Sequence, residues 1–504
     1  MCPSKHRSGS RDTAVIIDRG VSKGHISRGD ELTKGRTDSR SGEGLQYEWQ
    51  MDLPLDGSST RRPQCGASVK RQHSHLQSQL LEAILSESNL SAAYRRVKAN
   101  GGAAGIDGVE LPQFPLWYRL RRASLLRRLR LGNYVPSAVR RCYIPKSNGT
   151  KRPLGVPNLF DRIVQQAIHQ VLSPRLEPSF SKHSYGFRPK RGCQQAVRAL
   201  HGHIKDGYRW SIDVDLKSFF DTVPHDRALK ALRDHLDGDG PVVRLIERYL
   251  KAGYIELDQY HATTEGMPQG GPLSPLLSNL VLDALDTELQ SRGHRFVRYA
   301  DDFIVVVKTR RAAERVFASI CLLIEGGLGL TVNRDKSAVR PVRELSYLGF
   351  SFRLGKIVVS ESSLAELKYR LKRYSARSWS VSMRHRLYQL RQYVRGWMGY
   401  YGLSEVHSVW LPLDQWLRRR IRMCYWRQWK TSKRRYLNLV QLGTSAKFAG
   451  GFARSSKGYW RLAHGLGAFT AMTNKWLEAE GLTELRQLWW NFKFLRITAL
   501  KQTA

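Results

Sequence analysis

The chain has 504 residues, enough for two or three domains, and its 83 lysines and arginines against 43 acidic residues give a formal net charge of +40. A solvated surface does not need such an excess of positive charge, so we expect a polyanionic partner. No apolar run reaches the roughly 18–20 residues of a membrane-spanning helix, and the cations are interspersed with Trp and Tyr. This combination favours nucleic acid over a membrane surface.

The six cysteines are scattered and include no C-x-x-C pair, which argues against a zinc knuckle and against a disulfide framework. The N-terminal region has no apolar core of a secretory signal. Acidic residues such as Asp12, Asp18 and Glu31 also argue against an organellar transit peptide. We therefore expect a reducing intracellular location, the cytoplasm, including association with the nucleoid.

The first part of the chain divides into a polar leader and a region with regular elements. Residues 1–75 are rich in Ser, Gly, Arg and Asp and predict a poorly ordered leader. Apolar residues at helical spacing follow from Leu76, and a strand is predicted from Val139 to Pro145. The Gly-centred turn after this strand carries three cations within residues 146–152. Such a turn is usually solvated, but beside a carboxylate-metal centre its cations could hold a triphosphate.

The segment 209–221 predicts a strand that carries acids. Trp210, Ile212 and Val214 alternate with polar residues, so Asp213 and Asp215 share the opposite face. Both carboxylates point to the polar side. The spacing alone leaves open which of the two would bind a metal.

Residues 266–275 form a loop rich in Gly and Pro that leads into a helix, and its glycines would let a flat base or sugar approach the backbone. Residues 296–307 then predict a tight β-hairpin with Asp301 and Asp302 at its tip. Adjacent carboxylates in an apolar element need a neutralising partner, for which Mg²⁺ is the natural candidate. The alternative is a solvated Asp-Asp turn.

After about residue 356 the chain becomes strongly basic. Residues 361–440 contain 18 lysines and arginines and 4 acidic residues, and the cations alternate with Trp and Tyr. Aromatic and arginine side chains on one surface suit unpaired, folded RNA. The alternative is that the aromatic residues only pack between helices.

Seven stretches occur in an order and spacing that resemble one family. They are Gly105–Gly108, Ile144–Gly155, Ser184–Pro189, Asp215–Asp221, Gln269–Pro275, Tyr299–Asp302 and Tyr347–Phe350. The set, from about residue 78 to 500, resembles the group II intron-encoded reverse transcriptases of bacterial type with a maturase domain. The resemblance implies an α+β fold: a right-hand polymerase with fingers and palm in residues 76–355, then a mostly α-helical thumb and maturase domain in residues 356–504.

The resemblance also implies the residues of a polymerase site. It selects Asp215 over Asp213, because the family's metal-binding aspartate precedes the pattern Leu-Lys-x-Phe-Phe-Asp. The residues implied to hold two Mg²⁺ are Asp215, Leu216, Asp301 and Asp302. Those implied to contact the incoming nucleotide are Lys146, Arg152, Phe220, Gln269 and Gly270, with Phe220 excluding a 2′-hydroxyl. Those implied to support the primer end are Tyr347, Leu348, Gly349 and Phe350.

The basic C-terminal part resembles the thumb and maturase domain, which would grip intron RNA for splicing and mobility. The residues implied to contact RNA are Arg395, Trp397, Arg418, Arg419, Arg422, Lys430 and Lys457. The implied partners are group II intron RNA, an RNA template, a DNA primer or target, and dNTPs, with no membrane partner.

Two other functions remain open beside an RNA-directed DNA polymerase that also serves as a maturase. The chain could be an RNA chaperone with an idle polymerase site, although its intact aspartates favour the enzyme. It could be a reverse transcriptase recruited to host defence, although the long maturase-like C-terminus speaks against that role. The sequence departs from many relatives in lacking the Cys/His clusters of an H-N-H nuclease domain.

Overall fold

The computed structural model describes residues 78–145, 149, 151–236, 238 and 240–502. The expected leader, residues 1–75, and the nucleotide contact expected at Lys146 lie outside these described residues. In the part that is described, no helix is both long enough and apolar enough to cross a membrane.

The first described layer is helical and covers a small sheet. Its helices are α2 (Glu87–Asn100), α3 (Phe114–Arg130) and α4 (Leu159–Leu176). The sheet has the strand order β2-β1-β4-β5 and consists of β1 (Val139–Pro145), β2 (Lys151–Val156), β4 (Tyr254–Glu256) and β5 (Gln259–His261). The predicted strand from Val139 to Pro145 is confirmed, and it pairs antiparallel with β2.

The central sheet has the strand order β6-β7-β3-β8, and each of its pairs is antiparallel. Its strands are β3 (Trp210–Val214), β6 (Arg295–Tyr299), β7 (Asp302–Val307) and β8 (Ala338–Pro341). The helices of this region are α5 (Cys193–Lys205), α6 (Phe219–Thr222), α7 (His225–His235), α8 (Pro241–Leu250), α9 (Ser274–Ser291) and α10 (Arg310–Leu322). Helix α10 continues as a π-helical turn, Leu323–Leu328.

Both faces of the central sheet are buried. Phe303 and Val305 belong to one apolar cluster together with α9 and α10, whereas Ile304 and Val306 belong to a second cluster that continues into the C-terminal helices. This division follows from the period of two in a strand, which sends alternate side chains to opposite faces. The second cluster therefore joins the central sheet to the C-terminal part of the chain.

A small sheet of order β11-β10-β9 connects the central sheet to the C-terminal helices. Its strands are β9 (Ser346–Tyr347), β10 (Phe350–Arg353) and β11 (Lys356–Val359). The long helices that follow are α11 (Glu361–Tyr374), α12 (Met383–Tyr401), α13 (Trp410–Gln428) and α19 (Leu485–Gln502). The short ones are α14 (Ser432–Gln441), α15 (Ala446–Ala453), α16 (Tyr459–Leu462), α17 (Leu466–Ala471) and α18 (Asn474–Ala479).

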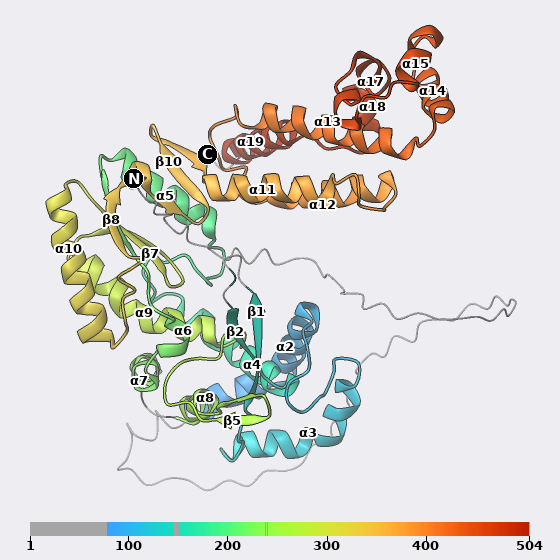
Figure 1. Ribbon diagram of the computed structural model, residues 1–504. Helices are drawn as coiled ribbons and strands as arrows, with labels where there is room; N and C mark the ends of the chain where they lie inside the picture. The colour runs from blue at the N-terminus through green and yellow to red at the C-terminus, as the bar shows by residue number, and fades with distance from the viewer. Residues whose placement is uncertain (1–77, 146–148, 150, 237, 239, 503–504) are drawn as a thin grey trace, which may run out of the picture.

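The C-terminal helices form an elongated arm. Helices α11, α12, α13 and α19 lie side by side, and the short helices gather at the end farthest from the central sheet (Figure 1). Ser360 and Ser382 begin α11 and α12 as N-caps, because each hydroxyl accepts a hydrogen bond from the backbone N–H three residues later. The expected helical C-terminal part is thus present.

Candidate active site

The predicted hairpin at residues 296–307 is confirmed. Tyr299 pairs with Asp302, so Ala300 and Asp301 form its two-residue turn. Ala300 has a φ of 57°, a backbone conformation that costs about 1 kcal/mol or more in a residue other than glycine. The surrounding contacts must therefore hold this turn in place.

Asp215 follows β3, which is the strand next to β7. Its Oδ2 accepts a hydrogen bond from Asn333 Nδ2 at 3.0 Å and lies 3.7 Å from Lys336 Nζ. Its backbone N–H donates to Ser337 Oγ at 3.0 Å. These contacts with the segment before β8 fix Asp215 where the strand ends.

The carboxylates of Asp215 and Asp301 lie close enough for their charges to interact. Burial raises the pKa of the Asp301 carboxyl, and the negative charge of Asp215 adds to that effect, whereas the charges of Arg152 and Arg298 oppose it. Two carboxylates that disfavour each other's charge form a site that a cation would stabilise. Among the described residues no group of three His, Cys, Asp or Glu side chains has the geometry of a metal site.

The donor types nevertheless fit Mg²⁺. This ion needs only one or two protein carboxylates, because water and substrate phosphates complete its octahedral shell. Asp302 follows in β7, and its backbone carbonyl lies 3.5 Å from Tyr347 Oη. Asp213 is instead enclosed in the sheet, and its carboxylate lies 4.0 Å from Arg340.

A buried ionic network supports the turn from below. Arg298 is fully buried and donates from Nε and Nη2 to both carboxylate oxygens of Asp286 in α9, at 2.5–3.0 Å. Its Nη1 donates to the Ala300 carbonyl at 2.9 Å and to Asn279 Oδ1 at 3.0 Å. One guanidinium therefore ties the strained turn residue to α9.

The loop 184–189 packs against the same turn. Asn279 Nδ2 donates to the Gly186 carbonyl at 2.9 Å. A Cβ on Gly186 would lie 2.2 Å from the Ala300 nitrogen, so only glycine allows this approach. The turn is thus held by a helix on one side and by a loop on the other.

The described residues among those expected to contact a nucleotide come from separate elements. Arg152 in β2 is near enough for its charge to lower the pKa of Asp301. Phe220 in α6 packs edge-on against Phe219 and accepts a backbone hydrogen bond from Met267. The carbonyl of Gln269 accepts from Gly155 N–H at 2.7 Å, which fixes the glycine loop against β2. Gly270 follows with its backbone exposed and φ at 115°.

The segment Tyr347–Phe350 is a tight hairpin rather than a continuous strand. Tyr347 pairs with Phe350, and both Leu348 and Gly349 have positive φ. Tyr400 Oη donates to the Leu348 carbonyl at 2.9 Å, and Ser363 Oγ donates to that of Gly349 at 3.2 Å. The hairpin is therefore anchored on α11 and α12.

Two of the expected RNA contacts are wrong. Trp397 is only 5% exposed and stacks on Tyr401 at 4.3 Å, so it belongs to the core of the helical arm. Arg422 is also buried, and its Nε donates to the Met472 carbonyl at 2.8 Å. Burial lowers its pKa to about 10. Both side chains face inward because they lie on the packed faces of α12 and α13.

The other expected RNA contacts differ in their exposure. Arg418 pairs with Glu484 and is mostly covered. Arg419 donates to the Trp460 carbonyl and lies over the Trp460 ring, 3.9 Å from its centre. The exposed ones are Arg395, Lys430 and Lys457.

The sequence reasoning missed the support of the turn, namely Arg298 with Asp286 and Asn279. One signal was available, because Asn279 and Asp286 interrupt the apolar face of α9 seven residues apart. Polar groups on the packed face of a helix require buried partners. The pairing with Arg298 could not be derived from spacing alone.

Comparison with known proteins identifies two domains. Residues 144–352 match the family model for reverse transcriptase (RNA-dependent DNA polymerase), and residues 364–443 match that for the group II intron maturase-specific domain. The first contains the central sheet and the second begins in α11. Together they confirm the expected fold class, α+β, with a right-hand polymerase followed by a mostly helical thumb and maturase domain.

Individual relatives agree with these matches. Protein YkfC of Escherichia coli (strain K12) is 33% identical over 354 residues, which are 62% of this chain and 92% of that protein. The group II intron-encoded protein LtrA of Lactococcus lactis subsp. cremoris is 36% identical over 293 residues, 44% of this chain and 49% of LtrA. The putative COX1/OXI3 intron 2 protein of Saccharomyces cerevisiae is 28% identical over 53% of this chain and 38% of its own length. This chain thus spans less than half of the last two relatives. It belongs to the group II intron-encoded reverse transcriptases, with a reverse transcriptase domain followed by a maturase-specific domain.

Proposed function

We propose that this chain polymerises DNA on an RNA template and also binds group II intron RNA as a maturase. The observation that carries the proposal is the meeting of Asp215 and Asp301 at the ends of neighbouring strands, with interacting charges. A half-buried carboxylate pair of this kind is costly unless a cation joins it. Its retention in a reverse transcriptase domain is best explained by catalysis.

We assign the metal-binding role to Asp215 and Asp301, with Asp302 and the backbone of Leu216 beside them. Mg²⁺ held there would lower the pKa of the primer 3′-hydroxyl and stabilise the leaving pyrophosphate. Lys336, near Asp215, and Arg298, below the turn, hold the carboxylates in position. The Tyr347–Phe350 hairpin would support the primer end, because it touches both β7 and the helical arm.

The incoming dNTP would lie between β2 and α6. Arg152 would bind its phosphates, together with Lys146, and the exposed backbone at Gly270, next to Gln269, would allow the base or sugar to approach. Phe220 would lie under the sugar. Its ring would leave no room for a 2′-hydroxyl, which accounts for a preference for dNTPs.

We expect the Phe220→Ala variant to incorporate ribonucleotides more readily. Removing the ring opens space for the 2′-hydroxyl, so the dNTP preference, measured as a ratio of kcat/KM values, should fall roughly tenfold or more. Steady-state primer extension with each nucleotide checks this result. Phe220→Tyr, which keeps the ring, should retain the preference; an unchanged preference in Phe220→Ala would contradict the role assigned to Phe220.

The basic helical arm, residues 356–504, would bind intron RNA, and residues 76–355 would form the polymerase. Arg395, Lys430 and Lys457 are exposed and available to phosphates. Binding through phosphates releases counterions, so affinity falls steeply with salt.

We expect RNA affinity to drop roughly a thousandfold or more between low and moderately raised salt, if six or more phosphates are neutralised. Filter binding of a structured group II intron RNA over a salt series measures the slope. An affinity that stays constant across the series would contradict electrostatic binding by the arm.

Primer extension on an RNA template with dNTPs and Mg²⁺ tests the polymerase directly. DNA synthesis by the full chain supports the enzyme. Absence of synthesis together with tight RNA binding would favour the alternative, a splicing chaperone with an idle polymerase site.

A further inference from the structure

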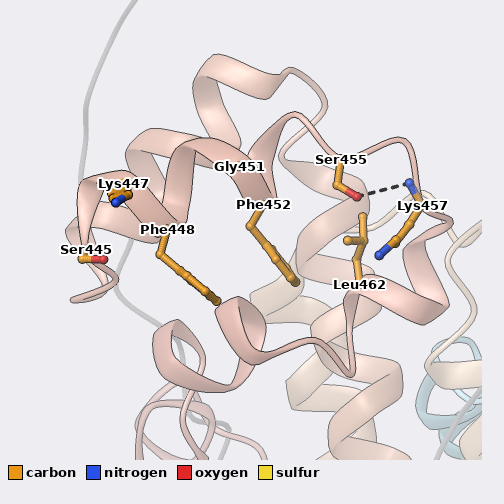
Figure 2. Close-up of a pocket in the computed structure, with 8 residues that line it drawn as sticks. All are labelled: Ser445, Lys447, Phe448, Gly451, Phe452, Ser455, Lys457 and Leu462. Atoms are coloured by element: carbon orange, nitrogen blue, oxygen red, sulfur yellow. Dashed lines mark hydrogen bonds between the residues drawn. The ribbon is translucent and has the colours of Figure 1, made fainter.

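Helix α15 lines a hollow, and this helix lies at the far end of the helical arm, away from the candidate active site (Figure 1). The hollow has a volume of about 520 Å³ and opens to the surface. Helix α15, the segment that leads to α16 and the last residue of α16 supply its walls. Phe448, Phe452 and Leu462 form the apolar lining, and Lys447 and Lys457 are the cations. Figure 2 shows both phenylalanine rings projecting from α15 into the hollow, with Lys457 beside Leu462.

The two aromatic rings differ in how firmly they are held. Phe452 is half-buried, and its ring meets Trp426 edge-on at 5.4 Å. Gly465 and Gly467 lie so close to this ring that a Cβ on either would come within 3.0 Å of it. Phe448 lies almost parallel to Phe452, at 13° and 6.4 Å between ring centres, yet it is 43% exposed. The hollow therefore presents one free aromatic ring beside a fixed one.

The stretch of chain that contains the lining of the hollow carries only positive formal charge. Residues 415–477 contain 14 lysines and arginines and no Asp or Glu. Lys447 and Lys457, both exposed, lie on opposite sides of the two rings (Figure 2). Because this stretch has no acidic residue, its positive charge favours the binding of an anion.

We propose that this hollow binds one unpaired base of an RNA strand, which stacks on Phe448 while Lys447 and Lys457 contact the phosphates on either side of it. This assignment rests on the proposed RNA-binding function and names a subsite for it. An exposed aromatic ring between cations suits a single strand, because a duplex already stacks its bases and offers phosphates alone. RNA is favoured over DNA because the hollow follows directly on the maturase-specific domain, residues 364–443.

The test measures binding of the full chain to a short single-stranded RNA of mixed sequence, by fluorescence anisotropy at fixed salt. The Phe448→Ala variant should bind about tenfold more weakly, the loss expected for one base stack. Phe448→Tyr, which keeps a flat ring, should bind as the wild type does. Leu437→Ala is the matched control, because Leu437 is 55% exposed on the neighbouring helix α14 and does not line the hollow.

A duplex RNA of the same sequence separates stacking from charge. Phe448→Ala should leave duplex binding unchanged, whereas Lys447→Gln should weaken single-stranded and duplex RNA alike. If Phe448→Ala lowers the affinity for single-stranded and for duplex RNA equally, the base-binding role is overturned. If Phe448→Ala lowers the affinity for single-stranded DNA more than that for single-stranded RNA, the choice of RNA is overturned.

The same experiment distinguishes this inference from the proposed function. If the wild-type chain fails to bind the RNA at low salt, the RNA-binding function itself is refuted and the subsite with it. If the wild type binds and Phe448→Ala binds equally well, the subsite alone is refuted.

Discussion

The Asp301→Ala variant should extend a primer at least roughly a thousandfold more slowly than the wild type. The reason is that Asp301 lies close enough to Asp215 for their charges to interact, and its removal takes away one of the carboxylates that would hold a metal ion at the primer end. Primer extension on an RNA template, with dNTPs and Mg²⁺, measures the loss.

RNA binding by the same variant should remain close to that of the wild type, because the outer part of the basic arm, with α14 and α15, lies at the end farthest from the central sheet (Figure 1). Asp234→Ala is a matched control, since it removes an exposed carboxylate from α7. Extension by Asp301→Ala at the rate of this control would refute the metal assignment. A parallel loss of RNA binding would instead indicate that the variant is misfolded.

The Asp286→Ala variant should lose about 3–5 kcal/mol of folding free energy, the cost of leaving the Arg298 guanidinium buried without a counter-ion. The same change should abolish DNA synthesis, because Arg298 would no longer hold the Ala300 carbonyl and the turn that carries Asp301. Chemical denaturation and primer extension measure the two effects.

A double variant separates the two effects. Asp286→Leu combined with Arg298→Met replaces the ion pair with apolar side chains of similar size, which often restores stability. We expect most of the folding free energy to return while DNA synthesis stays low, because no donor remains for the Ala300 carbonyl. Full activity in the double variant would contradict the positioning role of Arg298.

Local patterns predicted the active-site hairpin well and its support poorly. Alternation on both sides of Tyr299–Asp302 specified two strands and their turn, since a hairpin is formed by neighbouring residues. The choice between Asp213 and Asp215 could not be made in this way. It depends on where β3 ends and on Asn333, more than a hundred residues away.

The alternation of cations and aromatic residues in the arm was the least reliable predictor of which side chains are exposed for RNA binding. Trp397 shares the packed face of α12 with Val394 and Tyr401, at helical spacing, and this pattern signals a core as well as it signals a binding surface. Arg422 satisfies its guanidinium on a carbonyl fifty residues later in the chain. Such partners depend on tertiary packing, which a single sequence does not reveal.

The shared packing of sheet and arm has a consequence for the order in which the chain acquires its structure during synthesis. Gln194 in α5 donates to the carbonyls of Gly399 and Tyr400, at 2.9 and 2.7 Å, and α5 belongs to the apolar cluster that continues into the arm. When Asp215 and Asp301 have left the ribosome, these acceptors have not yet been made. The face of the central sheet that packs against the arm therefore cannot be covered before α12 is made. A ribosome that stalls before residue 400 leaves a chain in which this part of the core is still open to water.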